Sequence, residues 1–149
     1  MLVHAPAKLN LCLFLGPRRG DGLHELCSLF EPLALFDPIE VSAGGRDEVI
    51  CPGVEGENLA ARALAALRAR GWDHPPLRLR IEKRIPLAAG LGGGSADAAA
   101  VLRLASGEVD DLPAIAAGIG ADVPSQLLPS LALVQGAGER VERLPEPPV

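Results

Sequence analysis

A glycine-rich segment in the middle of the chain is the strongest candidate for chemistry. Residues 86–100 read PLAAGLGGGSADAAA, with four glycines within residues 90–94. Glycines allow successive backbone N–H groups to turn toward one anion without a clash with Cβ atoms. A helix directly behind such a turn adds unpaired N–H groups and a partial positive charge. The segment therefore predicts a phosphate-binding loop, with Ser95 as the N-cap of the helix and a further hydroxyl donor.

The loop differs from the two commonest nucleotide motifs. No lysine follows the last glycine, as a Walker A loop requires, and Ser95 takes the place of the third glycine of a GxGxxG loop. A plain flexible turn before a helix is the alternative, but so many adjacent glycines carry a large cost in conformational entropy. We therefore interpret the segment as a phosphate loop of another kind.

Lysine is rare in this chain, which makes its two occurrences informative. Only Lys8 and Lys83 among the 14 basic residues are lysines. Lys8 interrupts an apolar stretch, where an unpaired cation is unfavourable, so we expect an acid or a phosphate beside it. Lys83 falls in an alternating segment, residues 77–85, and for this lysine an exposed position on a strand face is an acceptable interpretation.

A candidate acid lies in the segment GIGADVP, residues 118–124. Asp122 stands between an expected helix end and a proline turn, where a carboxylate can be held rigidly. It could accept a proton in catalysis, or it could cap a short helix that begins at Pro124. The spacing alone leaves both interpretations open.

Periodicity and turn residues define the elements that position these groups. Asn58 is a good N-cap and Gly71 a stop for one helix. Because the elements lack a regular βαβ rhythm, we expect an α+β fold and not a doubly wound sheet. Strands are expected at residues 3–15, 26–36, 39–41, 48–51, 77–85, 131–135 and 140–144, and helices at residues 58–70, 95–104 and 112–119.

Composition excludes several classes of function. The chain has 149 residues, the size of one domain, and a net charge of −5 with no basic face, so no nucleic-acid partner is expected. Neither a signal peptide nor an apolar run long enough for a membrane span is visible. Three cysteines without a CxxC pattern are expected to be buried free thiols in a reducing cytoplasm.

Three separated segments resemble the GHMP kinases: PAKLN at residues 6–10, the loop and helix at residues 86–100, and GADVP at residues 120–124. RRGDGLHEL at residues 18–26, ENL at 57–59 and GAGE at 136–139 resemble one branch, whose small-molecule substrate is a cytidyl-diphospho sugar alcohol of non-mevalonate isoprenoid synthesis. The resemblance implies phosphorylation of its 2-hydroxyl.

The same resemblance implies a fold and a domain organisation. Residues 1–144 are expected to form the N-terminal ATP-binding domain of the family, with the ribosomal protein S5 domain 2-like fold: a mixed sheet with helices packed on one side. Residues 145–149 are expected to be a linker or a cut end. The second domain of such kinases is not expected within this chain.

Carried over to this sequence, the resemblance implies residue roles. Asp122 is the base that takes the hydroxyl proton, and Lys8 pairs with it and stabilises the transferred phosphoryl group. Asn10 orients the hydroxyl end of the substrate, and His24 hydrogen-bonds its cytosine. Mg²⁺ is expected with ATP, without an assigned protein ligand. The ATP phosphates bind Gly90, Leu91, Gly92, Gly93, Gly94 and Ser95, and the adenine side is near Asn58 and Lys83.

Two alternatives to this function remain. One is a GHMP kinase with another small acceptor, and the segment RRGDGLHEL speaks against it. The other is a non-catalytic nucleotide-binding module. Leu23 and Ala96, which replace the usual tyrosine and second serine of the resembling kinases, favour the latter, whereas the presence of Lys8 and Asp122 opposes it. The sequence leaves the oligomeric state open.

Overall fold

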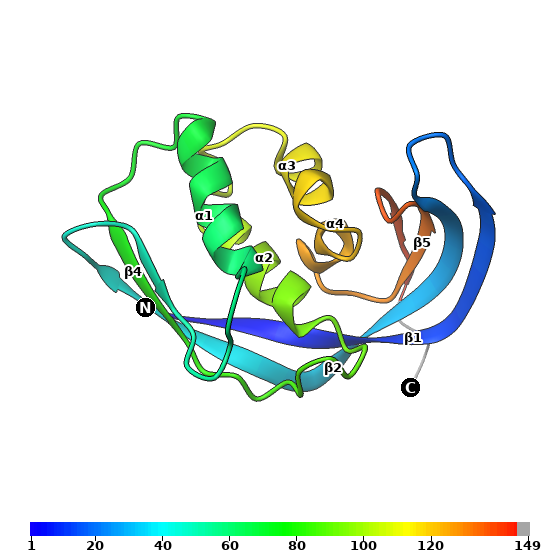
Figure 1. Ribbon diagram of the computed structural model, residues 1–149, viewed down its shortest axis with the longest axis horizontal. Coiled ribbons are helices and arrows are strands. Elements are labelled where there is room, and N and C mark those ends of the chain that lie inside the picture. The colour runs from blue at the N-terminus through cyan, green and yellow to red at the C-terminus, as the bar shows by residue number, and fades with distance from the viewer. Residues whose placement is uncertain (146–149) are drawn as a thin grey trace.

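Two long antiparallel strands run through the whole of the computed structural model, which describes residues 1–145 (Figure 1). β1 (Leu2–Arg18) and β2 (His24–Ala43) pair from one end to the other. Both curve strongly, and their hairpin end rises on the same side as the helices (Figure 1). The other strands are β3 (Glu48–Ile50), β4 (Leu77–Ile81), β5 (Ala132–Gly136) and β6 (Arg140–Arg143).

β2 is the central strand of one mixed sheet. β1 follows one of its edges, while β4 pairs with residues 39–43 and β5 with residues 26–30 along the other edge. The resulting order is β3-β4-β2-β5-β6, with β1 beside β2. Only β3 and β4 run parallel among the paired strands that the structure describes, so the sheet is mixed, as expected.

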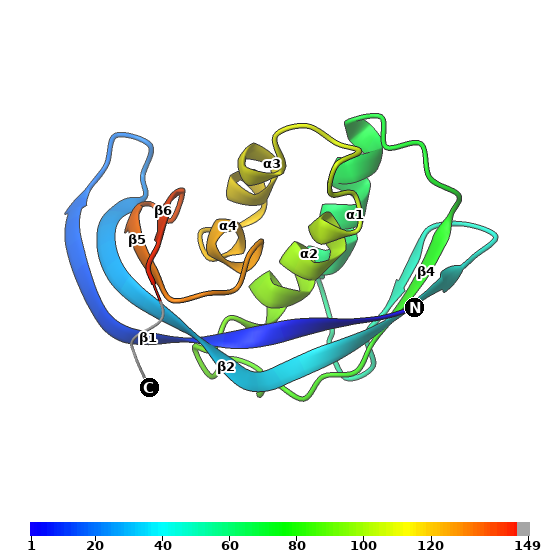
Figure 2. The same ribbon diagram turned by 180° about the vertical axis from the view of Figure 1, so that it is seen from behind.

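The helices lie together on one side of the sheet, and the view from behind shows the same arrangement (Figures 1 and 2). Asn58 begins α1 as expected, because its side-chain oxygen accepts the N–H groups of Ala60 and Ala61. Asp111 caps α3 in the same way. The helices are α1 (Leu59–Ala69), α2 (Gly93–Arg103), α3 (Leu112–Ile119) and α4 (Val123–Gln126).

α2 is the most deeply buried helix. It packs against α1, β1 and α4, and its residues from Ala96 to Leu102 are all buried. A helix with so many alanines can approach its neighbours closely, because the side chains end at Cβ. Aliphatic side chains such as Leu67, Leu79 and Leu102 fill the space around it.

Three differences from the sequence prediction affect the surroundings of the site. The strands expected at residues 26–36 and 39–41 are one strand, since β2 continues through Asp37 and Pro38 to Ala43. β4 ends at Ile81 instead of residue 85. α2 starts at Gly93, so Ser95 lies inside the first turn and is not the N-cap. The expected linker falls, apart from Pro145, outside the described residues.

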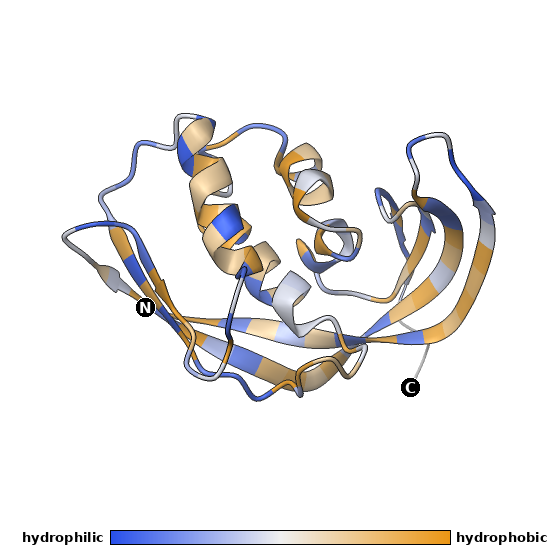
Figure 3. Cartoon of the chain, viewed as in Figure 1, coloured by the Kyte–Doolittle hydropathy of each residue, from blue (hydrophilic) through white to orange (hydrophobic). Residues whose placement is uncertain are grey.

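The hairpin end of the sheet exposes an apolar strip (Figure 3). Leu13 and Leu15 alternate along β1 and share one face, Leu11 lies at a register shift of the same strand, and each of the three is more than half exposed. No other described part of the chain covers them. Among residues 1–145, no helix has the length and hydropathy needed to cross a membrane.

The turn between β5 and β6 packs directly against the segment before α4. Gly138 has a φ of +109°, and a Cβ atom there would lie 2.0 Å from the carbonyl oxygen of Ala121. That distance is far inside van der Waals contact, so only glycine fits. This close packing fixes the backbone next to Asp122.

We expect Gly138→Ala to lower the free energy of unfolding by about 2 kcal/mol or more, from backbone strain and overlap. Gly45→Ala is the matched control, since a Cβ atom there meets nothing within 4 Å; it should change stability by less than about 0.5 kcal/mol. Chemical denaturation of both variants checks this. Equal stabilities would contradict the close packing of the turn.

Candidate active site

The glycine segment forms an open loop between β4 and α2. Gly92 is the N-cap of α2 with a φ of +69°, and within residues 1–145 no side chain caps this end of the helix. The first N–H groups of a helix have no partner inside it. A cavity of about 250 Å³ lies in front of them, lined by residues 85–95 together with Leu59 and Lys83. Backbone donors and the helix dipole therefore face a space that fits an anion.

Lys8 lies directly against this loop. Its backbone N–H donates to the carbonyl oxygen of Leu91 at 2.9 Å. A Cβ atom on Gly92 would lie 3.0 Å from both Cγ and Cε of Lys8, so the aliphatic stem of the lysine fills the space beside that glycine. The pairing of β1 with β2 shifts register between Pro6 and Lys8. Such bulges redirect a backbone N–H or a side chain, here toward the loop.

The Lys8 ammonium has the acidic partner that the sequence predicted. Lys8 is only 5% exposed, and its Nζ lies 3.2 Å from Oδ2 of Asp122. It also donates to Oδ1 of Asn10 at 2.5 Å and stands 4.7 Å from the centre of the Phe30 ring. A carboxylate, an amide and an aromatic face together compensate for the loss of hydration.

Asp122 sits at the N-cap position of α4, but its side chain makes no capping bond. Its backbone carbonyl accepts the hydroxyl of Ser125 at 2.8 Å instead. The carboxylate is 30% exposed and is directed at Lys8. The capping interpretation of this residue is therefore wrong, and the carboxylate is accessible on the solvent side of the ion pair.

Asn10 is oriented by a relay that the sequence did not reveal. Its Nδ2 donates to Oγ of Ser28 at 2.8 Å, and that hydroxyl donates to the carbonyl oxygen of Cys12 at 2.6 Å. Ser28 is fully buried. These bonds direct the amide oxygen of Asn10 toward Lys8. A serine in an apolar strand is a weak signal, so sequence reasoning could not select Ser28.

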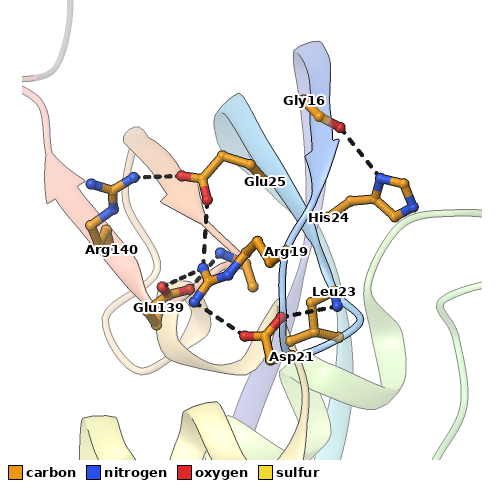
Figure 4. A network of polar contacts seen from close by, with 9 residues as sticks. Gly16, Arg19, Asp21, Leu23, His24, Glu25, Glu139 and Arg140 are labelled. Atoms are coloured by element: carbon orange, nitrogen blue, oxygen red, sulfur yellow. Dashed lines mark hydrogen bonds and ion pairs between the residues drawn. The ribbon is translucent and has the colours of Figure 1, made fainter.

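A second cavity, of about 380 Å³, opens between the hairpin tip and the α3–α4 connection. Arg19 contacts Asp21, Glu25 and Glu139 there, with its closest bond, 2.9 Å, to Glu139 (Figure 4). The bond to Glu139 raises the pKa of Arg19, and the same bond lowers the pKa of Glu139. The network connects the RRGDGLHEL and GAGE segments across the sheet.

Not every predicted substrate residue lines this cavity. Leu23 is part of its wall, whereas His24 is not. The His24 ring is exposed and its Nδ1 lies 3.3 Å from the carbonyl oxygen of Gly16, on the far side of the strand from Asp21 (Figure 4). In this arrangement His24 is separate from Lys8 and Asp122.

Lys83 is not on an exposed strand face, so that interpretation of the sequence is wrong. It follows the end of β4, and its ammonium lies between the carboxylates of Asp37 and Asp97. Burial opposes the charged form of Lys83, but the bonds to both carboxylates outweigh it and raise the pKa. Asn58, Lys83 and Asp97 line a small cavity of about 90 Å³ next to the loop.

Asp37 and Asp97 were missed by the sequence analysis. The only signal for them was an acid within an apolar strand and another within an alanine-rich helix. Within residues 1–145, no group of three or more His, Cys, Asp or Glu side chains could hold a metal ion by itself.

Comparison with known proteins places this geometry in a family. A family model described as the GHMP kinases N terminal domain matches residues 58–128. The 4-diphosphocytidyl-2-C-methyl-D-erythritol kinase of Anaeromyxobacter sp. (strain K) is 48% identical over 97% of this chain and 50% of its own length. The enzyme of the same name from Carboxydothermus hydrogenoformans is 41% identical, over 97% of this chain and 54% of its own length. The chain thus spans about half the length of these relatives.

Solved protein structures show the same similarity. A crystal structure of 4-(cytidine 5'-diphospho)-2C-methyl-D-erythritol kinase superposes with a TM-score of 0.82 at 45% identity, covering 100% of this chain and 57% of that one. The phosphomevalonate kinase of Streptococcus pneumoniae has a TM-score of 0.62 at 16% identity, over 91% of this chain and 48% of that one, which is a likeness of fold alone. The chain accordingly has the fold of the N-terminal half of these kinases, and residues 58–128 match the GHMP kinases N terminal domain.

Proposed function

We propose that the chain carries the ATP-binding and catalytic half of a kinase that phosphorylates the 2-hydroxyl of 4-diphosphocytidyl-2-C-methyl-D-erythritol. The observation that carries this proposal is the Lys8–Asp122 pair, 3.2 Å apart, joined to the glycine loop through the Lys8–Leu91 backbone bond. A phosphate loop, a compact cation and an accessible carboxylate are the parts that phosphoryl transfer to an alcohol needs.

In the proposed reaction, Asp122 accepts the proton of the substrate hydroxyl. The hydroxyl oxygen forms a bond to the γ-phosphorus of ATP while the bond to the β–γ bridging oxygen breaks, and ADP leaves. Lys8 lies beside both the base and the loop, so its positive charge stabilises the phosphoryl group in transit. The Asn10 amide, fixed by Ser28, orients the hydroxyl. Magnesium bound with ATP neutralises charge on its β- and γ-phosphates.

In this proposal, one cavity binds ATP and the other binds the acceptor substrate. The phosphates of ATP bind the loop residues 90–95, and the adenine lies toward Asn58 and Lys83. Because Oδ1 of Asn58 is used by the helix cap, its amide NH₂ is the group that can reach a ligand. The cytidyl end of the acceptor lies in the cavity beside Arg19 and Leu23. Reaching the cytosine requires the exposed His24 ring to rotate away from Gly16.

Several further observations support the proposal. The relatives that carry this enzyme's name match 97% of the chain. The cavity of about 380 Å³ is large enough for a nucleoside portion of a substrate. The three cysteines are free, which fits the reducing cytoplasm in which we place the reaction, but the expectation that they are buried is wrong, since Cys12 is exposed and the other two are partly exposed.

We expect Asp122→Asn to reduce kcat by about 100-fold or more, since the amide retains the shape but cannot accept the proton. Its affinity for ATP should stay close to that of the unchanged protein, because the loop is intact. ADP release with ATP, magnesium and the cytidyl substrate measures kcat, and a separate nucleotide titration measures affinity. Equal kcat values for both proteins would contradict a base at residue 122.

Lys8→Met should also reduce kcat by about 100-fold or more, because methionine keeps much of the stem beside Gly92 but removes the charge. Arg84→Met is the matched control: Arg84 is an exposed cation at the start of the same loop segment, paired with Glu82, and its loss should leave kcat within about two-fold. Circular dichroism confirms that both variants fold. Similar losses in both variants would indicate a general effect of charge near the loop.

The same assay distinguishes the kinase from its alternatives. ADP release that requires both the cytidyl substrate and Asp122 supports the proposal. Release that instead requires mevalonate, homoserine or a sugar would indicate another GHMP kinase. Nucleotide binding without turnover on any acceptor would favour a nucleotide-binding module, and would overturn the catalytic roles of Lys8 and Asp122 in this chain.

A further inference from the structure

A buried cluster of ionisable groups lies beneath the phosphate loop and has no part in the transfer reaction. It consists of Asp37 from β2, Lys83 after β4 and Asp97 from α2. Their side chains are 0%, 11% and 4% exposed, respectively. Two carboxyl groups thus share one ammonium in a site with little water. Whether the cluster is neutral or negative depends on a single proton.

The cluster connects both ends of the loop. Oδ1 of Asp37 accepts the backbone N–H groups of Arg84 at 2.5 Å and Ile85 at 2.8 Å, where the segment leaves the sheet. At the other end, Nζ of Lys83 lies 3.1 Å from the position of a Cβ atom on Gly93, the first residue of α2. A charge in this cluster therefore stands directly below the helix end that faces the anion cavity.

The two carboxyl groups are not equivalent. Asp37 receives three donors: the ammonium of Lys83 and the two backbone N–H groups. Asp97 receives only Lys83, on Oδ2 at 2.8 Å, and its buried Oδ1 has no hydrogen-bond partner among residues 1–145. An ionised carboxylate with an unpaired buried oxygen is unfavourable, so Asp97 is the group that holds the exchangeable proton.

The electrostatics of the surroundings agree with this assignment. Burial raises the pKa of Asp97 to about 7, against the opposing effect of Lys83. Lys83 and Asp37 face the carboxyl from two neighbouring elements, and Cys51, whose thiol pKa is also raised by burial, faces it from the segment after β3. Glu57 and Asn58, before α1, line the same small cavity.

We propose that Asp97 is a positioning residue whose protonation state sets the charge beneath the phosphate loop, so that nucleotide binding is coupled to the uptake of a proton. This inference rests on the proposed nucleotide site. With Asp97 protonated, the positive Lys83 and the negative Asp37 balance, and the N-terminus of α2 attracts phosphate. With Asp97 ionised, the cluster is negative and opposes phosphate.

The protonation state of Asp97 determines how nucleotide affinity changes with pH. Protonated Asp97 predominates below about pH 7, so nucleotide binds more tightly there, and affinity falls as the pH rises through that value. Coulomb's law at an effective dielectric constant of about 20 makes the difference between the two charge states roughly ten-fold for a phosphate charge about 12 Å from the carboxyl. By linkage, a bound nucleotide raises the pKa of Asp97 and draws a proton from solution.

The test compares three forms of the chain: the unchanged protein, Asp97→Asn and Glu82→Gln. Glu82 is an exposed carboxylate in the same segment as Lys83, so it controls for any nearby negative charge. Each form is titrated calorimetrically with ATP and magnesium at about pH 6 and about pH 8, on either side of the Asp97 transition. Protonation of the nucleotide itself is common to all three forms and cancels in the comparison.

We expect the unchanged protein and Glu82→Gln to lose affinity by roughly five-fold more than Asp97→Asn between the two pH values. Asp97→Asn should bind more tightly than the unchanged protein at the higher pH. An equal pH dependence in all three forms overturns the inference, as does a dependence that disappears in Glu82→Gln as well. Absence of nucleotide binding at both pH values overturns the proposed function itself.

A second measurement needs no variant. Titrations of the unchanged protein near pH 7 in buffers of different ionisation enthalpy give the number of protons taken up on binding. We expect a net uptake of roughly half a proton. Release of protons, or no exchange, overturns the inference even if Asp97→Asn fails to fold.

Discussion

The buried ammonium of Lys8 is the charge around which the site is organised. A cation removed from water costs several kcal/mol unless it is paired and hydrogen-bonded. Here the compensation comes from three directions: Asp122 at the start of α4, Asn10 on the same strand and the ring of Phe30 on β2. Satisfying this one charge brings together two strands and the α4 end of the helical layer, and it leaves a carboxylate exposed at their junction.

The position of the loop depends on the same lysine. A backbone bond from Lys8 to Leu91 and the contact of its stem with Gly92 fix the end of the loop where α2 begins. The start of the loop is fixed by Asp37, through the N–H groups of Arg84 and Ile85. The long β1–β2 pair, which carries both Lys8 and Asp37, is therefore the frame against which the anion site is held.

Local sequence patterns predict much of this arrangement, but they do not predict the contacts between distant segments. The α1 cap at Asn58, the α3 helix and a partner for Lys8 were predictable, because caps, periodicity and the cost of an unpaired charge are local properties. Lys83 was misjudged because it alternates with Leu77, Leu79 and Ile81, the buried face of β4, and not with the exposed arginines. Asp37 and Asp97 become its partners only through packing between distant segments. Ser95 looked like a cap because the sequence does not show that Gly92, with a left-handed φ, begins the helix.

The two lysines and the arginines perform different physical tasks in this chain. Arg68 and Arg103 spread their planar groups over several acceptors, including the backbone carbonyls of Trp72, His74 and Gln126. A guanidinium suits such separated acceptors, whereas an ammonium is a compact charge that fits between converging ones. Lys8 and Lys83 occupy the two buried positions where carboxylates or amides converge on a point. The scarcity of lysine in the sequence thus has a structural counterpart: one lysine is paired with a carboxylate that stays accessible, and the other balances carboxyls sealed beneath the loop.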